Sequence, residues 1–345
     1  MTRKSAIHFL DNPGDLDRTL RDILDGKSAF YVADAHTAPI FTQHFGFSPD
    51  VITAPGEESK SLMVLTDLWR LLLEKGLTRK DYLVAFGGGS ITDLAGLAAS
   101  TYKRGLGLIH IPTTLIGMVD AASGGKTAID FGGIKNSIGS FYLPDHILIA
   151  PDLLQTLPPE EILSGKGEIL KYALLTGDDP ETMLQDEHLP RTVRRCLEYK
   201  EAIVSQDLRD AGTRQVLNLG HTAGHALEAL HLNNPRYAPV PHGIAVAAGI
   251  VIECYLSFVQ ERMTQSELMR IARLVKEYFP AVSFACKDDD EIWGYALQDK
   301  KNAASGTAFT TCMLLDKPGG ICKASQVFRR DWDEAMDFYK DFFGV

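Results

Sequence analysis

Two histidines stand four residues apart in the stretch "RQVLNLGHTAGHALEAL", residues 214–230. If this stretch is a helix, His221 and His225 project from one face with Cβ atoms about 5–6 Å apart, so both can reach one metal ion. The segment "HTAGH" lacks the glutamate of the H-E-x-x-H pattern, which disfavours a metalloprotease. A metal site, an acid–base site and two ordinary helix residues all stay open at this point.

Two further residues have the chemistry of metal ligands. Glu168 lies in "SGKGEILKY" and His242 in "VPHGIAVAAGI", each beside small residues that leave room for a bulky neighbour. A lone histidine is more often structural than a ligand, but several candidates of this kind favour a catalytic zinc site. Such a site has three protein ligands and one open position.

A glycine-rich turn follows the apolar run of "YLVAFGGGSITDLAGLAAS", residues 82–100. A strand that enters Gly87 to Ser90 and continues as a helix lets backbone N–H groups approach a pyrophosphate. The turn lacks the usual G-x-G-x-x-G spacing, so its glycines can also serve only a tight turn. Asp93 is either a favourable first-turn acid or, with Ser90, a ligand for ribose or nicotinamide groups.

Several cationic and amide side chains follow in "IPTTLIGMVDAASGGKTAIDFGGIKNSIGSFYLPD", residues 111–145. Lysines in glycine-rich loops usually face water. Lys126, Lys135 and Asn136, together with the upstream Arg104, nevertheless form a group of donors in an acidic chain. Because a phosphate or carboxylate needs several such donors, the segment predicts an anionic substrate.

Composition limits the classes of protein. The chain has 345 residues, 45% of them hydrophobic, and a net charge of -10, which predicts about two domains and no general nucleic-acid or anionic-membrane binding. Its five cysteines form no CxxC pair, which predicts a reducing, cytoplasmic location. We find no apolar run of membrane-spanning length.

The elements that position these residues change character along the chain. Short apolar runs predict strands at 28–34, 82–86, 106–111 and 146–150, with a helix within 59–76. After Pro158 and Pro159, helical periodicity dominates, at 160–175, 189–207, 219–232, 242–263 and 265–279. We therefore predict a Rossmann-like α/β domain over 1–155 and an all-α domain over 156–345.

The motifs taken together resemble a known family. The stretches "GGGSITDLAG", "YKRG", "IPTTLIGMVDAASGGKTAID", "KNSIGSFYLP", "LLQTLP", "GEILKYALL", "RQVLNLGHTAGHALE", "PHG" and "DKK" occur in the order and spacing of the 3-dehydroquinate synthases. These enzymes are sugar phosphate cyclases. The resemblance runs from about residue 55 to residue 302, nearly three quarters of the chain.

This resemblance implies a first domain that binds NAD, a second domain that binds metal and substrate, and a homodimer. It implies zinc, or cobalt, held by Glu168, His221 and His242, and makes His225 a neighbouring or proton-handling residue. The implied NAD contacts are Asp34, Glu57, Lys60, Gly88, Gly89, Ser90, Ile91, Thr92, Asp93, Thr113, Thr114, Lys126, Lys135, Leu153, Leu154, Gln155 and Thr156.

The implied substrate is a sugar phosphate. Its polar groups would meet Asp120, Lys126, Asn136, Lys171, Lys200, Arg214 and Asn218, with Lys300 or Lys301 at the phosphate and Arg104 reaching it from a second subunit. The implied reaction converts 3-deoxy-D-arabino-heptulosonate 7-phosphate to 3-dehydroquinate and phosphate. Transient oxidation at C5 acidifies the neighbouring C–H, phosphate leaves, C5 is reduced again, and an aldol step closes the ring.

Some positions depart from the family pattern. Ile134 replaces a glycine, Ile244 replaces a glutamate, and His36 stands where an asparagine is common. None of these changes removes an implied metal ligand or phosphate-binding group.

Three other readings stay open. A different sugar phosphate cyclase, of the 2-epi-5-epi-valiolone or 2-deoxy-scyllo-inosose synthase type, would act on a substrate without a carboxylate. Arg214 argues against it, because arginine suits bidentate carboxylate binding. A glycerol-dehydrogenase-like polyol dehydrogenase would accumulate NADH and leave the lysines without an anion. A non-enzymatic NAD- or metal-binding regulator would bind without turnover.

Overall fold

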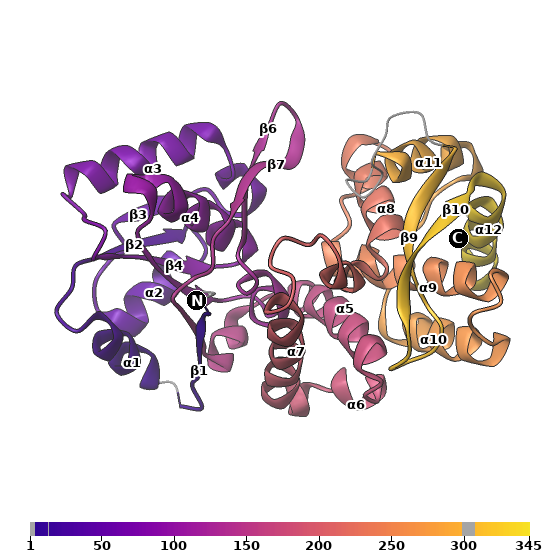
Figure 1. Cartoon of the computed structure of the whole chain (residues 1–345), viewed down its shortest axis with the longest axis horizontal. Coiled ribbons are helices and arrows are strands. Elements are labelled where there is room, and N and C mark those ends of the chain that lie inside the picture. Colours follow the sequence, from indigo (N-terminus) through magenta and orange to yellow (C-terminus); the bar gives the residue numbers. More distant parts are fainter. Residues whose placement is uncertain (1–3, 13, 299–307) are drawn as a thin grey trace. The chain divides into compact units, whose positions relative to one another are not determined.

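The computed structural model describes residues 4–12, 14–298 and 308–345 (Figure 1). The chain forms two compact units. Unit 1 comprises Met1–Pro158 and Val193–Arg209, and unit 2 comprises Pro159–Thr192 and Asp210–Val345. The segment Val193–Arg209 thus differs from the sequence expectation, which assigned everything after residue 155 to the second domain. Helix periodicity alone does not show which core an amphipathic helix covers.

Unit 1 is built on a six-stranded parallel sheet. In spatial order its strands are β1 (Ala6–Phe9), β8 (His146–Ile149), β5 (Gly107–Pro112), β4 (Tyr82–Gly87), β2 (Ala29–Asp34) and β3 (Val51–Thr53). The four predicted strands are confirmed and lie in the middle of the sheet. The two edge strands were not predicted, because His8 interrupts the apolar residues of β1 and β3 has only three residues.

Helices α1 (Asp15–Leu24), α2 (Ala38–Phe45), α3 (Leu62–Glu74) and α4 (Gly89–Thr101) connect or flank these strands. The predicted helix within 59–76 is α3. It begins after Ser61, whose Oγ accepts a hydrogen bond from the Val64 N–H, and Leu65, Leu68 and Leu72 bury one of its faces.

Short helical turns complete unit 1, together with most of α7 (Leu189–Val204). They are η1 (Gly56–Ser59), η2 (Tyr102–Arg104), the π-helical η3 (Gly117–Ala121) and η4 (Pro151–Thr156).

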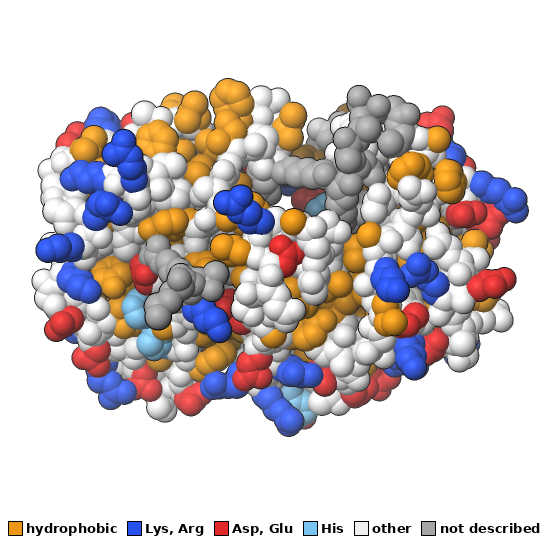
Figure 2. Space-filling model, in the orientation of Figure 1, with side chains coloured by type: hydrophobic (Ala, Val, Ile, Leu, Met, Phe, Trp, Pro, Cys, Tyr) orange, Lys and Arg blue, Asp and Glu red, His pale blue; other side chains and the backbone are white. Residues whose placement is uncertain are grey.

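A two-stranded antiparallel hairpin, β6 (Lys126–Phe131) and β7 (Ile134–Phe141), extends from unit 1 (Figure 1). Gly132 and Gly133 both have positive φ, which the tight turn between the strands requires. The hairpin leaves four large apolar side chains exposed, and hydrophobic side chains gather at this end of the molecule in Figure 2. They are Phe131, Ile134, Ile138 and Phe141.

Unit 2 is mainly helical. Its helices are α5 (Pro159–Thr176), α6 (Pro180–Met183), α8 (His221–Asn233), α9 (His242–Val259), α10 (Gln265–Tyr278), α11 (Asp289–Leu297) and α12 (Arg329–Phe343), with short turns η5 (Asp186–His188), η6 (Thr213–Asn218) and η7 (Cys286–Asp288). Helix α9 packs against α5, α8, α10 and α12.

Helix α9 is long and apolar enough to cross a membrane by length and composition alone. The expectation that no apolar run reaches this length is therefore wrong for α9. Because 78% of its apolar window is buried inside the protein, we interpret it as the core helix of unit 2.

Unit 2 also contains two strands that the sequence analysis did not predict. β9 (Phe309–Leu315) and β10 (Cys322–Phe328) form an antiparallel pair, so this unit is not all-α. A parallel α/β sheet followed by a largely helical part is otherwise confirmed.

Candidate nucleotide and metal sites

The glycine-rich turn of unit 1 lies at the carboxyl end of β4. Gly87 ends the strand, Gly88 precedes the helix, and α4 begins at Gly89. A Cβ atom on Gly88 would lie 3.0 Å from the Thr114 Cγ2 atom, so no larger residue fits without movement. The first turn of α4 thus lies at the edge where parallel sheets bind ligands, and the N-terminus of a helix generally favours an anion.

Residues predicted to bind NAD converge on Lys60, which is 2% exposed. Its Nζ lies 2.9 Å from the Asp93 Oδ2 atom and 3.4 Å from the Glu57 Oε2 atom, and it also donates to the Asn136 side chain. Burial raises the pKa of Asp93 to about 6, against the opposing charge of Lys60. Although burial lowers the pKa of Lys60, the carboxylates of Asp93 and Glu57 outweigh it and raise that pKa.

Two other predicted NAD contacts, Asp34 and Thr113, also lie at the carboxyl ends of strands in this sheet. Asp34 ends β2, and its carboxylate accepts bonds from the His36 and Thr37 N–H groups, 2.9 Å each, so it also shapes the turn into α2. Thr113 follows β5, donates its N–H to the Gly87 carbonyl, and has a buried Oγ1 with no hydrogen-bond partner among the described residues. A buried hydroxyl of this kind fits contact with a polar ligand.

The η4 turn follows β8 and contains the predicted NAD contacts Leu153 to Thr156. Thr114 accepts a bond at its Oγ1 from the Gly117 N–H. Lys126 and Lys135 are exposed on the β6–β7 hairpin.

Asp120, on η3, is bound by α7. The Lys200 Nζ lies 2.9 Å from the Asp120 Oδ1 atom and donates to the Asp120 carbonyl at 2.7 Å. The neighbouring Glu201 accepts a 2.5 Å bond from the Ser123 hydroxyl. Two successive residues of α7 therefore hold both ends of the Asp120–Ser123 segment.

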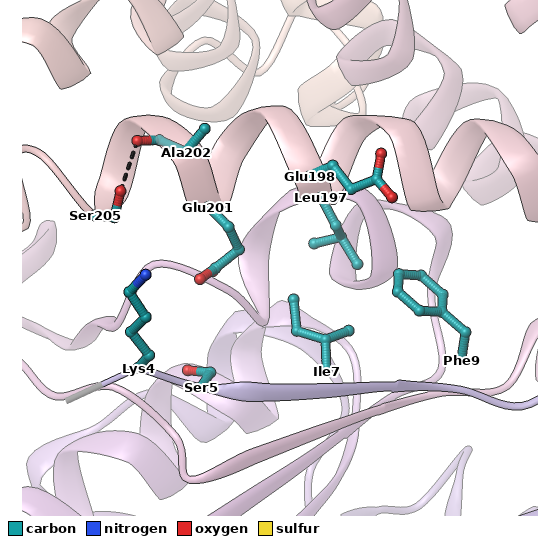
Figure 3. Close-up of a pocket in the computed structure, with 9 residues that line it drawn as sticks. All are labelled: Lys4, Ser5, Ile7, Phe9, Leu197, Glu198, Glu201, Ala202 and Ser205. Atoms are coloured by element: carbon teal, nitrogen blue, oxygen red, sulfur yellow. Dashed lines mark hydrogen bonds between the residues drawn. The ribbon is translucent and has the colours of Figure 1, made fainter.

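A cavity of about 370 Å³ lies between β1 and α7 (Figure 3). In this view Leu197 of α7 points toward Ile7 of β1, and Glu201 of α7 points toward Lys4 and Ser5. None of the predicted site residues lines it. Its lining residues are Lys4, Ser5, Ile7, Phe9, Leu197, Glu198, Glu201, Ala202 and Ser205.

Arg104 lies at the opposite end of the sheet strands from the glycine-rich turn. It lines a second cavity together with Tyr82 and Gly107, the first residues of β4 and β5. The reach of Arg104 into a second subunit stays a prediction. Lys300 and Lys301 lie outside the described residues.

In unit 2, three helices bring a carboxylate and three imidazoles together. Glu168 comes from α5, His221 and His225 from α8, and His242 from α9. The Glu168 Oε1 atom lies 3.4 Å from the His221 Nε2 atom and 3.2 Å from the His242 Nε2 atom. The ring centroid of His225 lies 5.2 Å from that of His221 and 5.6 Å from that of His242.

Hydrogen bonds on the far side of two rings determine which nitrogen faces this group. The His221 Nδ1 atom lies 3.1 Å from the Leu219 carbonyl, and the His242 Nδ1 atom lies 3.0 Å from the Glu228 carboxylate. Because both partners are acceptors, each Nδ1 donates its N–H to them and each Nε2 faces Glu168. Converging lone pairs repel one another unless a proton or a metal cation lies among them, so these residues fit a metal ion.

The ionisation of the group reflects the same convergence. Burial would raise the pKa of Glu168, but the charges of Lys171, 2.5 Å away, and His221 hold it well below its usual range. Burial lowers the pKa of His221. For His242, burial is outweighed by hydrogen bonds to Glu168 and Glu228, which raise its pKa to about 10.

Each of the three predicted ligands is next in sequence to a glycine at a helix crossing. A Cβ atom on Gly167 would lie 1.9 Å from the Gly243 carbonyl oxygen, and one on Gly243 would lie 1.7 Å from that of Ser164. The carbonyl of Gly220 would lie 2.0 Å from a Cβ atom on Gly249. Backbones that approach this closely leave no space for a side chain, so the glycines determine the spacing of α5, α8 and α9.

The remaining predicted residues of unit 2 lie on elements that adjoin this group. Lys171 is on α5, and Arg214 and Asn218 are on η6, which leads directly into α8. Arg214 is buried and Asn218 half-buried. Sequence reasoning missed Glu228, although it stands on the helix of His221 and His225.

Comparison with known proteins agrees with this arrangement. The sequence profile of the 3-dehydroquinate synthase N-terminal domain matches residues 50–164, and that of the C-terminal domain matches residues 165–302. The 3-dehydroquinate synthase of Parabacteroides distasonis is 40% identical over 348 residues, covering 96% of this chain and 97% of that protein. The enzyme of Pyrococcus furiosus is 42% identical over 258 residues, with 70% and 74% covered.

Solved structures share the fold. A 2-deoxy-scyllo-inosose synthase complexed with carbaglucose-6-phosphate, NAD+ and Co2+ superposes with a TM-score of 0.80 at 21% identity, covering 96% of this chain and 95% of that one. A 2-epi-5-epi-valiolone synthase from Streptomyces hygroscopicus with NAD+ and Zn2+ bound has a TM-score of 0.81 at 24% identity, with 99% and 98% covered.

These likenesses define the class of protein as one with the sugar phosphate cyclase fold. Within that class, the chain belongs to the 3-dehydroquinate synthase family. The predicted family is thereby confirmed, and neither of the other enzyme classes considered from the sequence is favoured.

Proposed function

We infer that this chain converts 3-deoxy-D-arabino-heptulosonate 7-phosphate to 3-dehydroquinate and phosphate, a carbon–oxygen lyase reaction. Family membership supports the reaction, and one observation in the structure carries it. The Glu168 Oε1 atom lies 3.4 Å from the His221 Nε2 atom and 3.2 Å from the His242 Nε2 atom, so the three groups converge on one point. One carboxylate and two imidazole nitrogens are the kind of donors that a catalytic zinc site uses.

We propose that Glu168, His221 and His242 hold zinc, or cobalt, and that His225 stands beside the ion. When bound, the metal supplies Lewis acidity that favours loss of a hydroxyl proton from the substrate. Lys171 pairs with the Glu168 Oε2 atom and so keeps this carboxylate ionised and oriented.

NAD is proposed to bind at the carboxyl end of the unit 1 sheet. The first turn of α4 supplies N–H groups for the pyrophosphate, and Lys60, Asp93 and Glu57 form the polar group beside it. Bound there, NAD would supply a reversible hydride acceptor beside the substrate. The remaining proposed contacts are Asp34, Thr113, Thr114, Lys126, Lys135 and Leu153 to Thr156.

Asp120 is proposed to handle the proton of the substrate hydroxyl. Lys200 holds its carboxylate and its carbonyl together, so the side chain is fixed in one orientation, as general acid–base chemistry requires. His225 is the second candidate for this proton transfer.

The anionic ends of the substrate are proposed to meet different cations. Lys126 and Asn136 bind the phosphate, with one lysine of Lys300 and Lys301 and with Arg104 of a second subunit. Arg214 binds the carboxylate, assisted by Asn218 and Lys171, because a guanidinium presents two parallel donors to a carboxylate. Because these donors hold the phosphate in a fixed orientation, we propose that orientation contributes more to its elimination than additional acid–base groups do.

We propose that the protein is cytoplasmic, acts as a homodimer on a small-molecule substrate, and binds neither nucleic acid nor membrane. The exposed apolar side chains of the β6–β7 hairpin are a surface that a subunit contact would cover. We further propose that residues 1–155 provide the NAD-binding function and residues 156–345 the metal- and substrate-binding function, although Val193–Arg209 is part of unit 1. Mass measurement in solution tests the dimer.

The reaction is tested by supplying the heptulosonate phosphate with zinc and an amount of NAD far below that of the substrate. We expect many phosphates released per NAD and no net NADH, because the hydride returns to the product. NADH formed in proportion to substrate would identify a polyol dehydrogenase, and no phosphate release would exclude the proposed reaction.

A further inference from the structure

Glu253 is a buried acid that the proposed reaction does not use. It lies on α9 within the apolar run "AVAAGIVIECYLSFV" and is 0% exposed. A carboxylate in such a position is strongly destabilising unless hydrogen bonds satisfy its oxygens. Its hydrogen bonds therefore indicate what the residue does.

The Glu253 carboxylate accepts bonds from three backbone N–H groups at the start of α8. Its Oε2 atom lies 2.7 Å from the Gly220 nitrogen, and its Oε1 atom lies 3.0 Å from the Thr222 nitrogen and 3.4 Å from the Ala223 nitrogen. The first N–H groups of a helix have no partner within that helix. Glu253 supplies that partner from a neighbouring helix.

Helix α8 has no side-chain cap of its own. The preceding residue is Gly220, in the left-handed region at φ 78°. A Cβ atom there would lie 2.5 Å from the Ile250 Cγ1 atom and 2.9 Å from the Val246 carbonyl, so neither serine nor aspartate fits. The close crossing of α8 and α9 thus excludes a local cap, and a longer acid on α9 takes its place.

The residue between these bonded N–H groups is His221, the first residue of α8. Its ring is already oriented by the bond from Nδ1 to the Leu219 carbonyl. The His221 ring bonds the carbonyl of Leu219, two residues before it. Glu253 bonds the N–H of Gly220, just before His221, and that of Thr222, just after it. The backbone on both sides of His221 is therefore fixed by hydrogen bonds.

We propose that Glu253 is a positioning residue for His221: by capping α8 across the helix crossing, it holds the Nε2 atom of His221 in the direction that metal binding requires. This inference rests on the proposed metal site but does not depend on which substrate the enzyme uses. Loss of a partner behind a metal ligand typically weakens metal binding by about 10–100-fold.

The test replaces Glu253 by glutamine, which has the same shape but turns an N–H₂ group toward one of the three backbone donors. We expect Glu253→Gln to bind zinc about 10–100-fold more weakly in competition with a chelating indicator, and the Co2+-substituted protein to change its visible absorption spectrum. Hydrogen exchange at Gly220, Thr222 and Ala223 should quicken in the absence of metal.

A matched control is Asp288→Asn, which alters another buried carboxylate of unit 2. Asp288 accepts bonds from Arg236, Tyr237 and the Ala285 N–H, none of them a proposed ligand. This variant should lose thermal stability yet keep the zinc affinity of the parent protein. Equal zinc affinity in Glu253→Gln and the parent, or equal loss in both variants, would overturn the positioning role.

If Glu253→Gln does not fold, Glu253→Asp, which keeps the charge but shortens the reach, takes its place in the same assay, with the same expected direction. A parent protein that binds no zinc would contradict the proposed metal site itself. If instead the parent protein and its Glu253 variants bind zinc with equal affinity, the metal site stands and only the positioning role of Glu253 is contradicted.

Discussion

The metal group of unit 2 and the nucleotide group of unit 1 are constructed in different ways. Glu168, His221 and His242 come from three helices whose backbones touch at glycines, with no side chain between them. The unit 1 group, in contrast, joins Lys60, Asp93 and Asn136 through side-chain ion pairs and hydrogen bonds, and Asn136 belongs to an exposed hairpin.

This difference has a physical consequence. Helices in backbone contact cannot shift by small amounts without steric overlap, so the metal ligands keep a defined geometry. Side-chain pairs on a hairpin can rearrange at a cost of about 1 kcal/mol per bond. Substitutions in the metal group should therefore have large, nearly all-or-none effects, and those in the nucleotide group should have graded ones.

The largest effect is expected for the metal ligands themselves. His221→Ala should lose bound zinc and lower kcat by about a thousandfold or more, since Lewis acidity contributes several kcal/mol to the barrier. His225→Ala should largely keep its zinc. Metal content after dialysis, measured together with turnover, checks both variants; equal loss of zinc would mean that both histidines are ligands.

A glycine at the helix crossing should come next. In Gly243→Ala, the new Cβ atom would lie 1.7 Å from the Ser164 carbonyl oxygen, so α5 and α9 must separate. We expect a loss of about 3 kcal/mol in the free energy of unfolding, and weaker zinc binding in the fraction that folds.

The matched control for this variant is Gly294→Ala on α11. A Cβ atom on Gly294 meets nothing within 4 Å, and alanine favours a helix over glycine by about 0.5–1 kcal/mol. Chemical denaturation should show a small gain in stability here. A Gly243→Ala protein as stable as this control would refute the role given to the helix crossing.

The effect in the nucleotide group should be smaller and depend on pH. The pKa of Asp93 is about 6, above its ordinary value of 3.8, because it is buried. The carboxyl group is thus mostly neutral below about pH 6 and mostly ionised above it. The ionised form accepts stronger hydrogen bonds from ribose or nicotinamide groups. NAD binding should tighten about tenfold as pH rises through this range.

Asp93→Asn should remove this pH dependence in fluorescence titrations with NAD. Asp67→Asn, at an exposed site on α3 that pairs with Arg70, should retain it. An unchanged pH profile in Asp93→Asn would show that another group controls NAD binding.

The smallest effect is expected where α7 supports Asp120. Ser123→Ala removes one hydrogen bond to Glu201, worth about 1 kcal/mol, and should lower kcat about fivefold while the KM for NAD stays the same. Ser205→Ala, which loses only a bond to the Ala202 carbonyl within its own turn, should match the parent. A Ser123→Ala enzyme with parental kcat would separate α7 from the positioning of Asp120.

Local patterns were enough to predict the central strands, the long helices and the residues of the metal group. Strand β1 was missed because His8 interrupts its apolar residues, and β3 because three residues carry too little pattern. The place of Val193–Arg209 in unit 1 was missed because it depends on contacts such as that of Lys200 with Asp120.

The supporting residues of the site were harder to predict because their roles are tertiary. Glu228 and Glu253 bind groups on other helices or in other turns, and nothing in their immediate neighbours indicates this. Glu253 does leave one signal, since it is a single acid within an apolar helical run that is otherwise buried. The sequence analysis assigned Lys60 to NAD and Asn136 to the substrate, whereas in the structure Lys60 donates a hydrogen bond to the Asn136 side chain.

The most direct test of the metal group is a crystal of the zinc-loaded protein measured at the zinc absorption edge. The account predicts one anomalous peak about 2.0–2.2 Å from Glu168 and from the Nε2 atoms of His221 and His242, with His225 beyond bonding distance. A peak bonded to His225 in place of one of these three, or no peak among α5, α8 and α9, would contradict it.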